Sequence, residues 1–300
     1  MRKFIDWDNI SDDEIRIIGD HKEKSIHRKR WGWVIITLLA IGLIILITTL
    51  IKQNSSNDNG QSPTLFDTIE TLHEQETEDN NTPFIRSFCE VRDTTINNLP
   101  LRLFIPYNAE PTLHRGKIDR SDSSIVYVNM AADLRADNGG ILGAFVLEGN
   151  PLAWGLSRRG YCSIIEDVVT VGVADNSPLF ERATEIGGHF FRQYPLVDNG
   201  KVSIETRAKV YNYLRALCQI GDNTFMVHSL AKVSFENFAK ALIDLGCDNA
   251  IYIVGYQSYG WARDQYDTIH EFGIDGCYEN GIPTTDNINY IVWRKQQYIN

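Results

Sequence analysis

The feature that most constrains this chain is an uninterrupted apolar run of 21 residues, WGWVIITLLAIGLIILITTLI, at positions 31–51. A helix rises about 1.5 Å per residue, so this run would be about 31 Å long, which matches the hydrocarbon core of a bilayer. A cleavable signal peptide, the alternative, has a shorter apolar core of about 7 to 15 residues near the N-terminus. We therefore expect a single transmembrane helix over residues 31–51, with the membrane as a partner.

The charges beside this run predict its orientation. His27, Arg28, Lys29 and Arg30 precede it directly, whereas only Lys52 follows it. Positively charged flanks stay on the cytoplasmic side of a membrane. We expect residues 1–30 to be a cytoplasmic tail and the C-terminal part to be extracytoplasmic.

Residues 52–83 differ in composition from the residues C-terminal to them. They contain one lysine, seven acidic residues and few aliphatic side chains, too little apolar surface to offset the entropy lost on ordering. We expect an acidic flexible stalk. Residues 84–300 remain, and they are long enough to bury the core of one globular domain.

Charge and cysteine content exclude some classes of function. The chain carries a net charge of −10, with 29 basic and 39 acidic residues, which argues against nucleic acid as a partner because phosphate binding needs a basic surface. Five cysteines without a CxxC pair are too few for a disulfide scaffold.

Short runs rich in β-branched and aromatic residues predict strands in this domain. These runs are 125–129, 141–147, 168–174, 224–229, 249–255 and 289–294. Asp198-Asn199-Gly200 predicts a tight hairpin, since Asn-Gly accommodates positive φ angles. Residues 205–218 fit either a helix or a strand.

Two helices have clear end signals. Ser177-Pro178 begins one that Gly187 closes, and Ser234 begins another that ends at Gly246. The second lies between two predicted strands and suggests a β-α-β unit. The expected fold class is α+β, a mixed α/β sheet with packed helices.

Common catalytic motifs are missing from the sequence. It has no Walker loop, GxGxxG or HExxH, and the seven histidines include no pair at metal-ligand spacing. The segment at 255–260, GYQSYG, lacks the glycine spacing of a serine nucleophile elbow. We expect no metal site, and the cofactor is left undetermined.

Four segments, taken in order, carry a resemblance. They are VN followed by AADL and GAFVLEGNPLAWG (128–155), RQYPLVDNGKV (192–202), RALC with GDNTFMVHS (215–229), and SFENFAKALIDLGCDNAIYIVG (234–255). They resemble the phosphodiester glycosidase family over roughly residues 95–265. The resemblance implies a hydrolase that acts on a sugar linked through phosphate, and hence a carbohydrate or glycan phosphodiester ligand.

The resemblance implies substrate-binding roles for Asn129, Gln193, Arg215 and Gly255, which lie in the matching segments. Arg215 is suited to phosphate because its planar guanidinium donates two parallel charge-assisted hydrogen bonds. Three of them have an ordinary alternative: Arg215 as a surface arginine or a partner for a core carboxylate, Asn129 as a turn former, and Gln193 as an exposed loop residue.

Four further residues are candidates by position. His228 and Ser229 end a predicted strand just before a helix, where ligand clefts open in α/β folds, although a buried strand histidine is equally ordinary. Asp133 and Glu185 are candidate catalytic carboxylates in or near the matching segments, because glycosyl transfer uses a carboxylate as acid or base. The ordinary alternative for both is a surface carboxylate, because most carboxylates lie at the surface.

One departure from the family opens an alternative function. Where the family has Leu-Asp-Gly-Gly, this chain has Ile253-Val254-Gly255-Tyr256, so valine replaces an acid at a strand end. The alternative is a non-catalytic glycan-binding or envelope interaction module on the same fold. A purely structural tether is a third possibility.

The charge asymmetry at the apolar run leads to a topology prediction. Protease added to intact cells with a permeabilised outer barrier should cut the stalk at 52–83 and release the C-terminal domain, because Arg28, Lys29 and Arg30 hold the N-terminus inside. Immunoblotting of the soluble fraction measures the release. Protection of the domain in intact cells would contradict this orientation.

Overall fold

The computed structural model describes residues 86–205, 211–255, 258–273 and 286–296. The predicted tail 1–30, transmembrane helix 31–51 and stalk 52–83 all lie outside these described residues. Within the described part of the chain, no helix has the length and apolar content needed to cross a bilayer. Residues Ile85–Asn300 form one unit.

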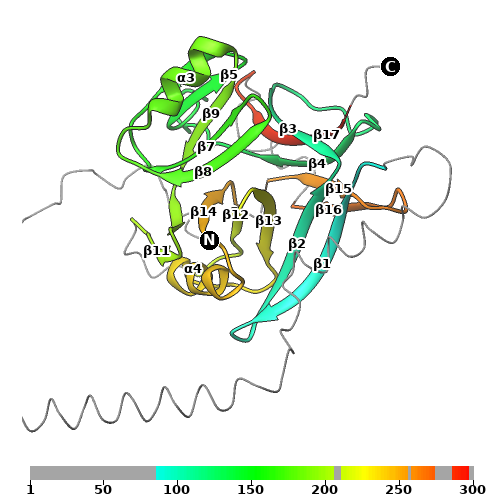
Figure 1. The fold of residues 1–300 in the computed structure, drawn as a ribbon. Coiled ribbons are helices and arrows are strands. Elements are labelled where there is room, and N and C mark those ends of the chain that lie inside the picture. Colours follow the sequence, from blue (N-terminus) through cyan, green and yellow to red (C-terminus); the bar gives the residue numbers. More distant parts are fainter. Residues whose placement is uncertain (1–85, 206–210, 256–257, 274–285, 297–300) are drawn as a thin grey trace, which may run out of the picture. The chain divides into compact units, whose positions relative to one another are not determined.

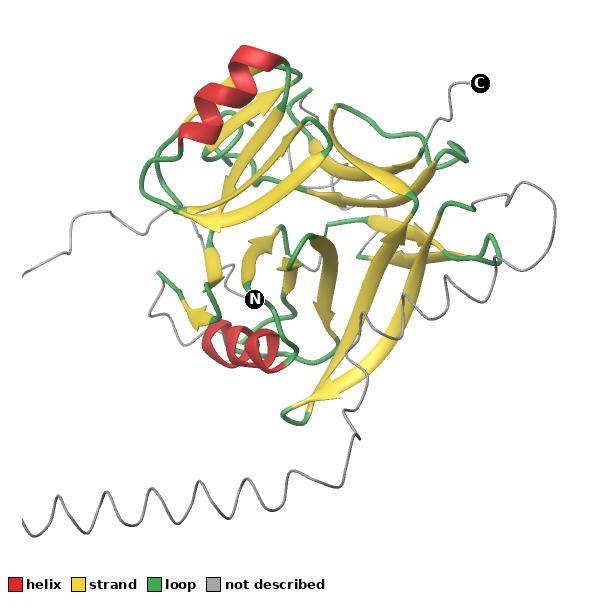
Figure 2. Cartoon of the chain, viewed as in Figure 1, coloured by secondary structure: helices red, strands yellow, loops and turns green. Residues whose placement is uncertain are grey.

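Three sheets build this unit (Figures 1 and 2). The first has, in spatial order, β1 (Phe88–Ile96), β2 (Leu99–Tyr107), β13 (Asn223–Ser229), β12 (Arg215–Ile220), β14 (Asn249–Ile253), β10 (Pro195–Asp198) and β11 (Lys201–Val202). The second has β16 (Ile269–Phe272), β15 (Gly260–Arg263), β4 (Ile125–Met130), β17 (Asn289–Lys295) and β3 (Ala109–Arg115). The third has β6 (Asn150–Trp154), β5 (Ala144–Leu147), β9 (His189–Gln193), β7 (Gly160–Ile165) and β8 (Val168–Val173).

The expected mixed sheet is wrong, because every strand pair among the described residues is antiparallel. The predicted strand-helix-strand unit is present, but its two strands are not neighbours. β13 and β14 run in the same direction on either side of β12, and each pairs with it in antiparallel register. The sequence between two strands does not reveal that a third strand inserts between them.

The two predicted helices are confirmed, with the expected N-caps; the second ends one residue before the expected Gly246, at a Leu245 C-cap. Helix α3 (Pro178–Ile186) begins at the Ser177 cap and ends at Gly187, whose φ is 79°. Helix α4 (Phe235–Asp244) begins at the Ser234 cap. Figure 1 shows α3 over the third sheet, where it packs on β5, β7 and β9, and α4 packs against β10 and β11.

The predicted strands correspond to β4, β5, β8, β13, β14 and β17, with ends shifted by a few residues. The hairpin is also confirmed, since Asp198 pairs with Lys201 and both Asn199 and Gly200 have positive φ. The ambiguous stretch 205–218 becomes strand from Arg215 onward, and residues 206–210 lie outside the described residues.

The core lies between the sheets. One cluster of buried side chains draws on all three, with Phe104 from β2, Tyr127 from β4, Phe191 from β9 and Ile251 from β14 among its members. Strand β4 is buried along its whole length, which explains why its sequence is a continuous apolar run rather than an alternating one.

Gly160 in β7 gives a test of how tightly the first and third sheets pack. A Cβ atom at this position would lie 2.6 Å from the Gln193 carbonyl oxygen, 2.8 Å from Ile251 Cγ2 and 2.9 Å from the Pro195 nitrogen. Two of these three atoms are backbone, so they cannot turn aside.

We expect Gly160→Ala to lower the free energy of unfolding by about 1 to 3 kcal/mol, as overpacking does, and the melting temperature by about 2 to 4 °C for each kcal/mol. Thermal melts measure the effect. Val168→Ala, at a side chain that is 62% exposed on β8, is the control and should change little. Equal melting temperatures for Gly160→Ala and wild type would contradict this packing.

Candidate functional site

A buried arginine ties two sheets together. Arg215, the first residue of β12, is 4% exposed, and its Nη1 donates to Asn129 Oδ1 at 2.7 Å and to the Ser258 carbonyl and Oγ at 2.8 Å each. Asn129 lies in β4 of the second sheet, and Ser258 follows β14. The guanidinium carbon stands 4.7 Å from the centre of the Phe272 ring. The structure thus brings two predicted site residues, Asn129 and Arg215, into direct contact.

His228 lies beside this arginine, because β12 and β13 pair Arg215 with His228. Its Nε2 is 3.1 Å from the Tyr127 hydroxyl, and its ring centre is 4.6 Å from those of both Phe104 and Phe272. Burial, and then the positive charge of Arg215, hold the pKa of His228 well below its ordinary 6.5. The imidazole is therefore neutral at neutral pH and offers hydrogen bonds rather than charge.

Tyr127 completes this pair. The residue is fully buried, and burial raises the pKa of its phenol well above the ordinary 10. The phenol therefore keeps its proton. Tyr127 and His228 make a neutral hydrogen-bonded pair at the inner side of the site.

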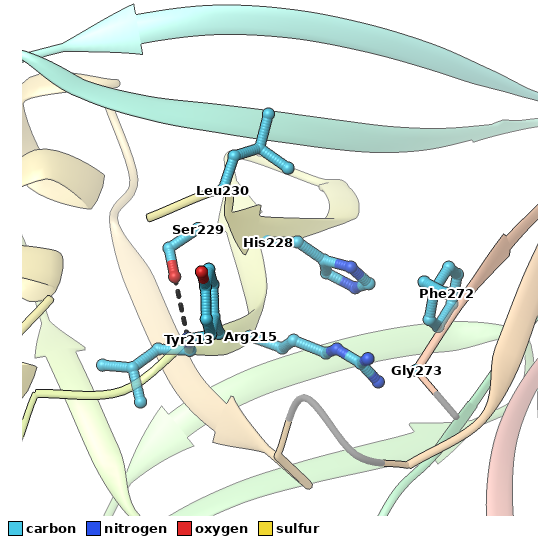
Figure 3. Close-up of a pocket in the computed structure, with 8 residues that line it drawn as sticks. Tyr213, Arg215, His228, Ser229, Leu230, Phe272 and Gly273 are labelled. Atoms are coloured by element: carbon cyan, nitrogen blue, oxygen red, sulfur yellow. Dashed lines mark hydrogen bonds between the residues drawn. The ribbon is translucent and has the colours of Figure 1, made fainter. Parts of the chain in front are cut away.

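Ser229 fastens the neighbouring segment. Its Oγ accepts a hydrogen bond from the Leu214 N–H at 2.8 Å, drawn as a dashed line in Figure 3, and its own N–H donates to the Leu214 carbonyl at 2.8 Å. These two bonds fix the chain that leads into β12. Ser229 is thereby engaged with backbone and holds one wall of the site.

These residues surround a cavity of about 310 Å³. Figure 3 shows the side chains of Arg215 and His228 extending toward Phe272, and the side chain of Leu230 pointing away from them. The lining residues that the structure describes are Tyr213, Leu214, Arg215, His228, Ser229, Leu230, Phe272 and Gly273. Three residues predicted to bind substrate, Arg215, His228 and Ser229, therefore line one cavity.

A second polar cluster forms around Asp133. Arg158 Nη1 donates to Asp133 Oδ2 at 2.6 Å and to Gln193 Oε1 at 3.1 Å, and its guanidinium carbon lies 4.4 Å from the centre of the Tyr194 ring. Gln193 Nε2 also donates to the Ala131 carbonyl at 3.1 Å and to Asp133 Oδ2 at 3.3 Å. The Asp133 side chain is 26% exposed. Neither Asp133 nor Gln193 is among the described residues that line the cavity.

A buried arginine holds Arg158 in place. Arg192 is 2% exposed and donates to three backbone carbonyls, those of Arg158 at 3.1 Å, Ala174 at 3.0 Å and Asp175 at 3.1 Å. Arg158 itself has a φ of 73°, an uncommon value for a residue with a side chain. The bond from Arg192 thus secures a strained turn that aims Arg158 at Asp133.

The structure does not bring Glu185 into either cluster. Glu185 is exposed on α3, which leads into β9 at His189, whereas Gln193 ends that strand. Four residue steps along a strand span about 13 Å. Glu185 therefore lies near the opposite end of β9 from the Asp133 cluster.

Gly255 lies in the turn that presents Ser258 to Arg215. Its carbonyl accepts a hydrogen bond from the Ser258 N–H at 2.9 Å, and the Val254 carbonyl accepts from Ser258 Oγ at 2.9 Å. Val254 itself is partly buried and packs against an apolar cluster that includes Met130 and Trp261. Gly255 contributes backbone to this turn.

Sequence reasoning missed Tyr127, Arg158, Ser258 and Phe272 as parts of the site. The partners of two of them lie far away in the chain, 101 positions for Tyr127 with His228 and 43 for Ser258 with Arg215. An aromatic residue in a run that is aliphatic up to Asn129 was the one local signal, at Tyr127 in IVYVN. Among the described residues, no three His, Cys, Asp or Glu side chains are placed to hold a metal ion.

Comparison with known proteins shows a fold and not a family. No family model matches the chain, and no curated protein matches it. The catalytic domain of zebrafish N-acetylglucosamine-1-phosphodiester alpha-N-acetylglucosaminidase, auto-inhibited by its pro-peptide, is similar in structure, with a TM-score of 0.51 and 13% identity over 73% of this chain and 86% of that one. A hypothetical protein from Synechocystis has a TM-score of 0.49 and 12% identity over 71% and 64% of the two chains. The chain thus shares a distant fold similarity with a phosphodiester glycosidase catalytic domain.

The lowered pKa of His228 predicts a pH dependence of stability. Below about pH 6.5 the unfolded chain takes up a proton on this histidine and the folded chain does not, so the free energy of unfolding falls as the pH falls. One such group contributes a slope of up to about 1.4 kcal/mol per pH unit. Replacing it by neutral glutamine, which keeps a hydrogen-bonding group near Tyr127, should remove this contribution.

We therefore expect the free energy of unfolding of His228→Gln to fall less steeply than that of wild type between pH 6.5 and 5, as measured by urea denaturation at several pH values. His189→Gln is the comparison, because burial also lowers the pKa of His189, though less far. An unchanged slope in His228→Gln would show that folding does not lower the pKa of His228.

Proposed function

We propose that residues 84–300 bind a sugar linked through phosphate in the Arg215 cavity and hydrolyse that linkage, as a phosphodiester glycosidase-like domain. The observation that carries the proposal is the convergence of Arg215, His228 and Ser229 on one cavity. The fold similarity to a domain whose name states activity on an N-acetylglucosamine phosphodiester supports the same ligand class.

The chemistry of the lining residues suits this ligand. A phosphodiester has one negative charge shared by two free oxygens, and a planar guanidinium can donate to both. The neutral His228 ring beside Arg215 adds hydrogen bonding without adding charge. Outside the described lining of the cavity, Asp133, ordered by Arg158 and Gln193, is the candidate acid or base.

A non-catalytic glycan-binding or envelope interaction module is the second candidate, and Val254 favours it. The resemblance has an acid at this position, whereas the Val254 side chain packs against apolar neighbours at the end of β14. In this candidate the same cavity holds the same ligand without turnover.

We also propose that the apolar segment 31–51 anchors the chain in a membrane with the domain outside the cytoplasm. The positive charges before that segment support this orientation. The domain would then meet ligands of the cell envelope.

Replacing Arg215 by lysine tests the proposed phosphate contact. We expect Arg215→Lys to bind methyl N-acetylglucosaminyl phosphate, a phosphodiester, about tenfold to a hundredfold more weakly, because a lost charge-assisted hydrogen bond is worth about 1.5 to 3 kcal/mol. Affinity for the neutral methyl N-acetylglucosaminide should barely change. Isothermal titration of the full chain measures both.

Arg294→Lys is the matched control, since Arg294 is also a partly buried arginine held by side-chain hydrogen bonds, to Asp122 and Ser124, but is not among the described residues that line the cavity. Thermal melts of both variants separate lost binding from lost folding. If Arg215→Lys keeps its melting temperature and binds the diester as tightly as wild type, Arg215 does not contact the phosphate.

Turnover separates the two candidate functions. Incubation of the wild-type chain with the same diester, followed by NMR of the free sugar, should show release if the domain is a hydrolase. Binding without release, in the presence and absence of divalent metal, would favour the non-catalytic module.

A further inference from the structure

The walls of the Arg215 cavity are mostly apolar. Of the side chains that line it, Tyr213, Leu214, Leu230 and Phe272 present rings or alkyl groups. Leu214 is 2% exposed and lies deep in the fold, whereas Leu230 is 41% exposed at the rim. The apolar lining therefore runs from the interior to the surface.

The polar groups lie on one side of this cavity. Figure 3 shows the Arg215 and His228 side chains pointing together toward Phe272, with Tyr213 and Leu230 placed away from the guanidinium. The Phe272 ring contacts both polar groups, at 4.7 Å from the guanidinium carbon and 4.6 Å from the imidazole centre. Tyr213 and Leu230 thus form an apolar part that is separate from the charged part.

The apolar surface also extends outside the cavity. Tyr211, two residues before Tyr213, is 61% exposed. Leu230 and Tyr211 are both exposed large hydrophobic residues, and of the two Leu230 lines the cavity. Such side chains gain free energy when a ligand covers them, in proportion to the apolar area that is buried.

From this arrangement we infer that the ligand is a sugar phosphodiester whose second alcohol is apolar, an alkyl or prenyl group rather than a second sugar. The phosphate lies at Arg215, and the apolar alcohol lies along Tyr213 and Leu230. The inference rests on the proposed function, and it specifies the substrate class of that site.

A chain-length series of ligands tests it. The probes are the methyl, ethyl and butyl diesters of N-acetylglucosamine 1-phosphate, with the methyl and butyl N-acetylglucosaminides as neutral controls. Binding to the full chain in phosphatidylcholine nanodiscs is measured by ligand-observed NMR, with empty nanodiscs as the blank. Each buried methylene tightens binding by up to about fourfold, so the butyl diester should bind about 10- to 60-fold more tightly than the methyl diester.

One variant and its control test whether this gain in affinity comes from Leu230. Leu230→Ser should reduce the butyl-to-methyl affinity ratio toward one, and its exposed position makes the change compatible with folding. Leu156→Ser is the matched control, because Leu156 is 71% exposed and is not among the described residues that line the cavity. It should leave the ratio as in wild type.

The outcomes separate this inference from the proposed function. Equal affinities for the methyl and butyl diesters, with both weakened by Arg215→Lys, would overturn the inference and leave the proposed function standing. A full butyl gain in Leu230→Ser would also overturn it. If no diester of the series binds, the proposed function fails and the inference fails with it.

Discussion

The burial of the Arg215 guanidinium is the constraint on which the rest of the site depends. A charge taken out of water is strongly destabilising unless hydrogen bonds compensate it. Here the compensation comes from two directions, Asn129 in the second sheet and Ser258 in the turn after β14. The start of β12, the end of β4 and Ser258 must therefore stay together, and of these the start of β12 lines the cavity.

The same burial decides the chemistry of His228. The register of β12 and β13 sets the imidazole beside the guanidinium, so desolvation and a neighbouring positive charge act together to keep it neutral. Tyr127 then meets the ring as a hydrogen-bonding partner and keeps its own proton. The cavity is consequently lined by one charged group and one neutral imidazole together with apolar side chains.

The Arg215 cavity and the Asp133 cluster are connected through the segment that follows β4. Asn289 holds this segment: its Oδ1 accepts from the Ala132 N–H at 2.7 Å, and its Nδ2 donates to the Ala132 carbonyl at 3.1 Å. Asn129 lies on one side of this anchor and Asp133 on the other. Because Arg192 fixes Arg158 from a third direction, the position of Asp133 depends on side chains from three separate parts of the chain.

Local chemistry in the sequence determined the helix caps at Ser177 and Ser234, the Asn199-Gly200 hairpin and the buried strand that holds Asn129, because each depends on residues only a few positions apart. The strand signal at 224–229 also placed His228 and Ser229 at a strand end, whereas Arg215 was a candidate through the family resemblance alone, within a stretch that fitted either a helix or a strand. The sequence did not show which strands pair, since β12 inserts between β13 and β14 from an earlier point in the chain. The sequence also did not show which residues bond to Arg215, or that Glu185 lies away from the Asp133 cluster. Only the tertiary structure decided these, because the free energy of burying a charge or a ring depends on which distant segments pack around it.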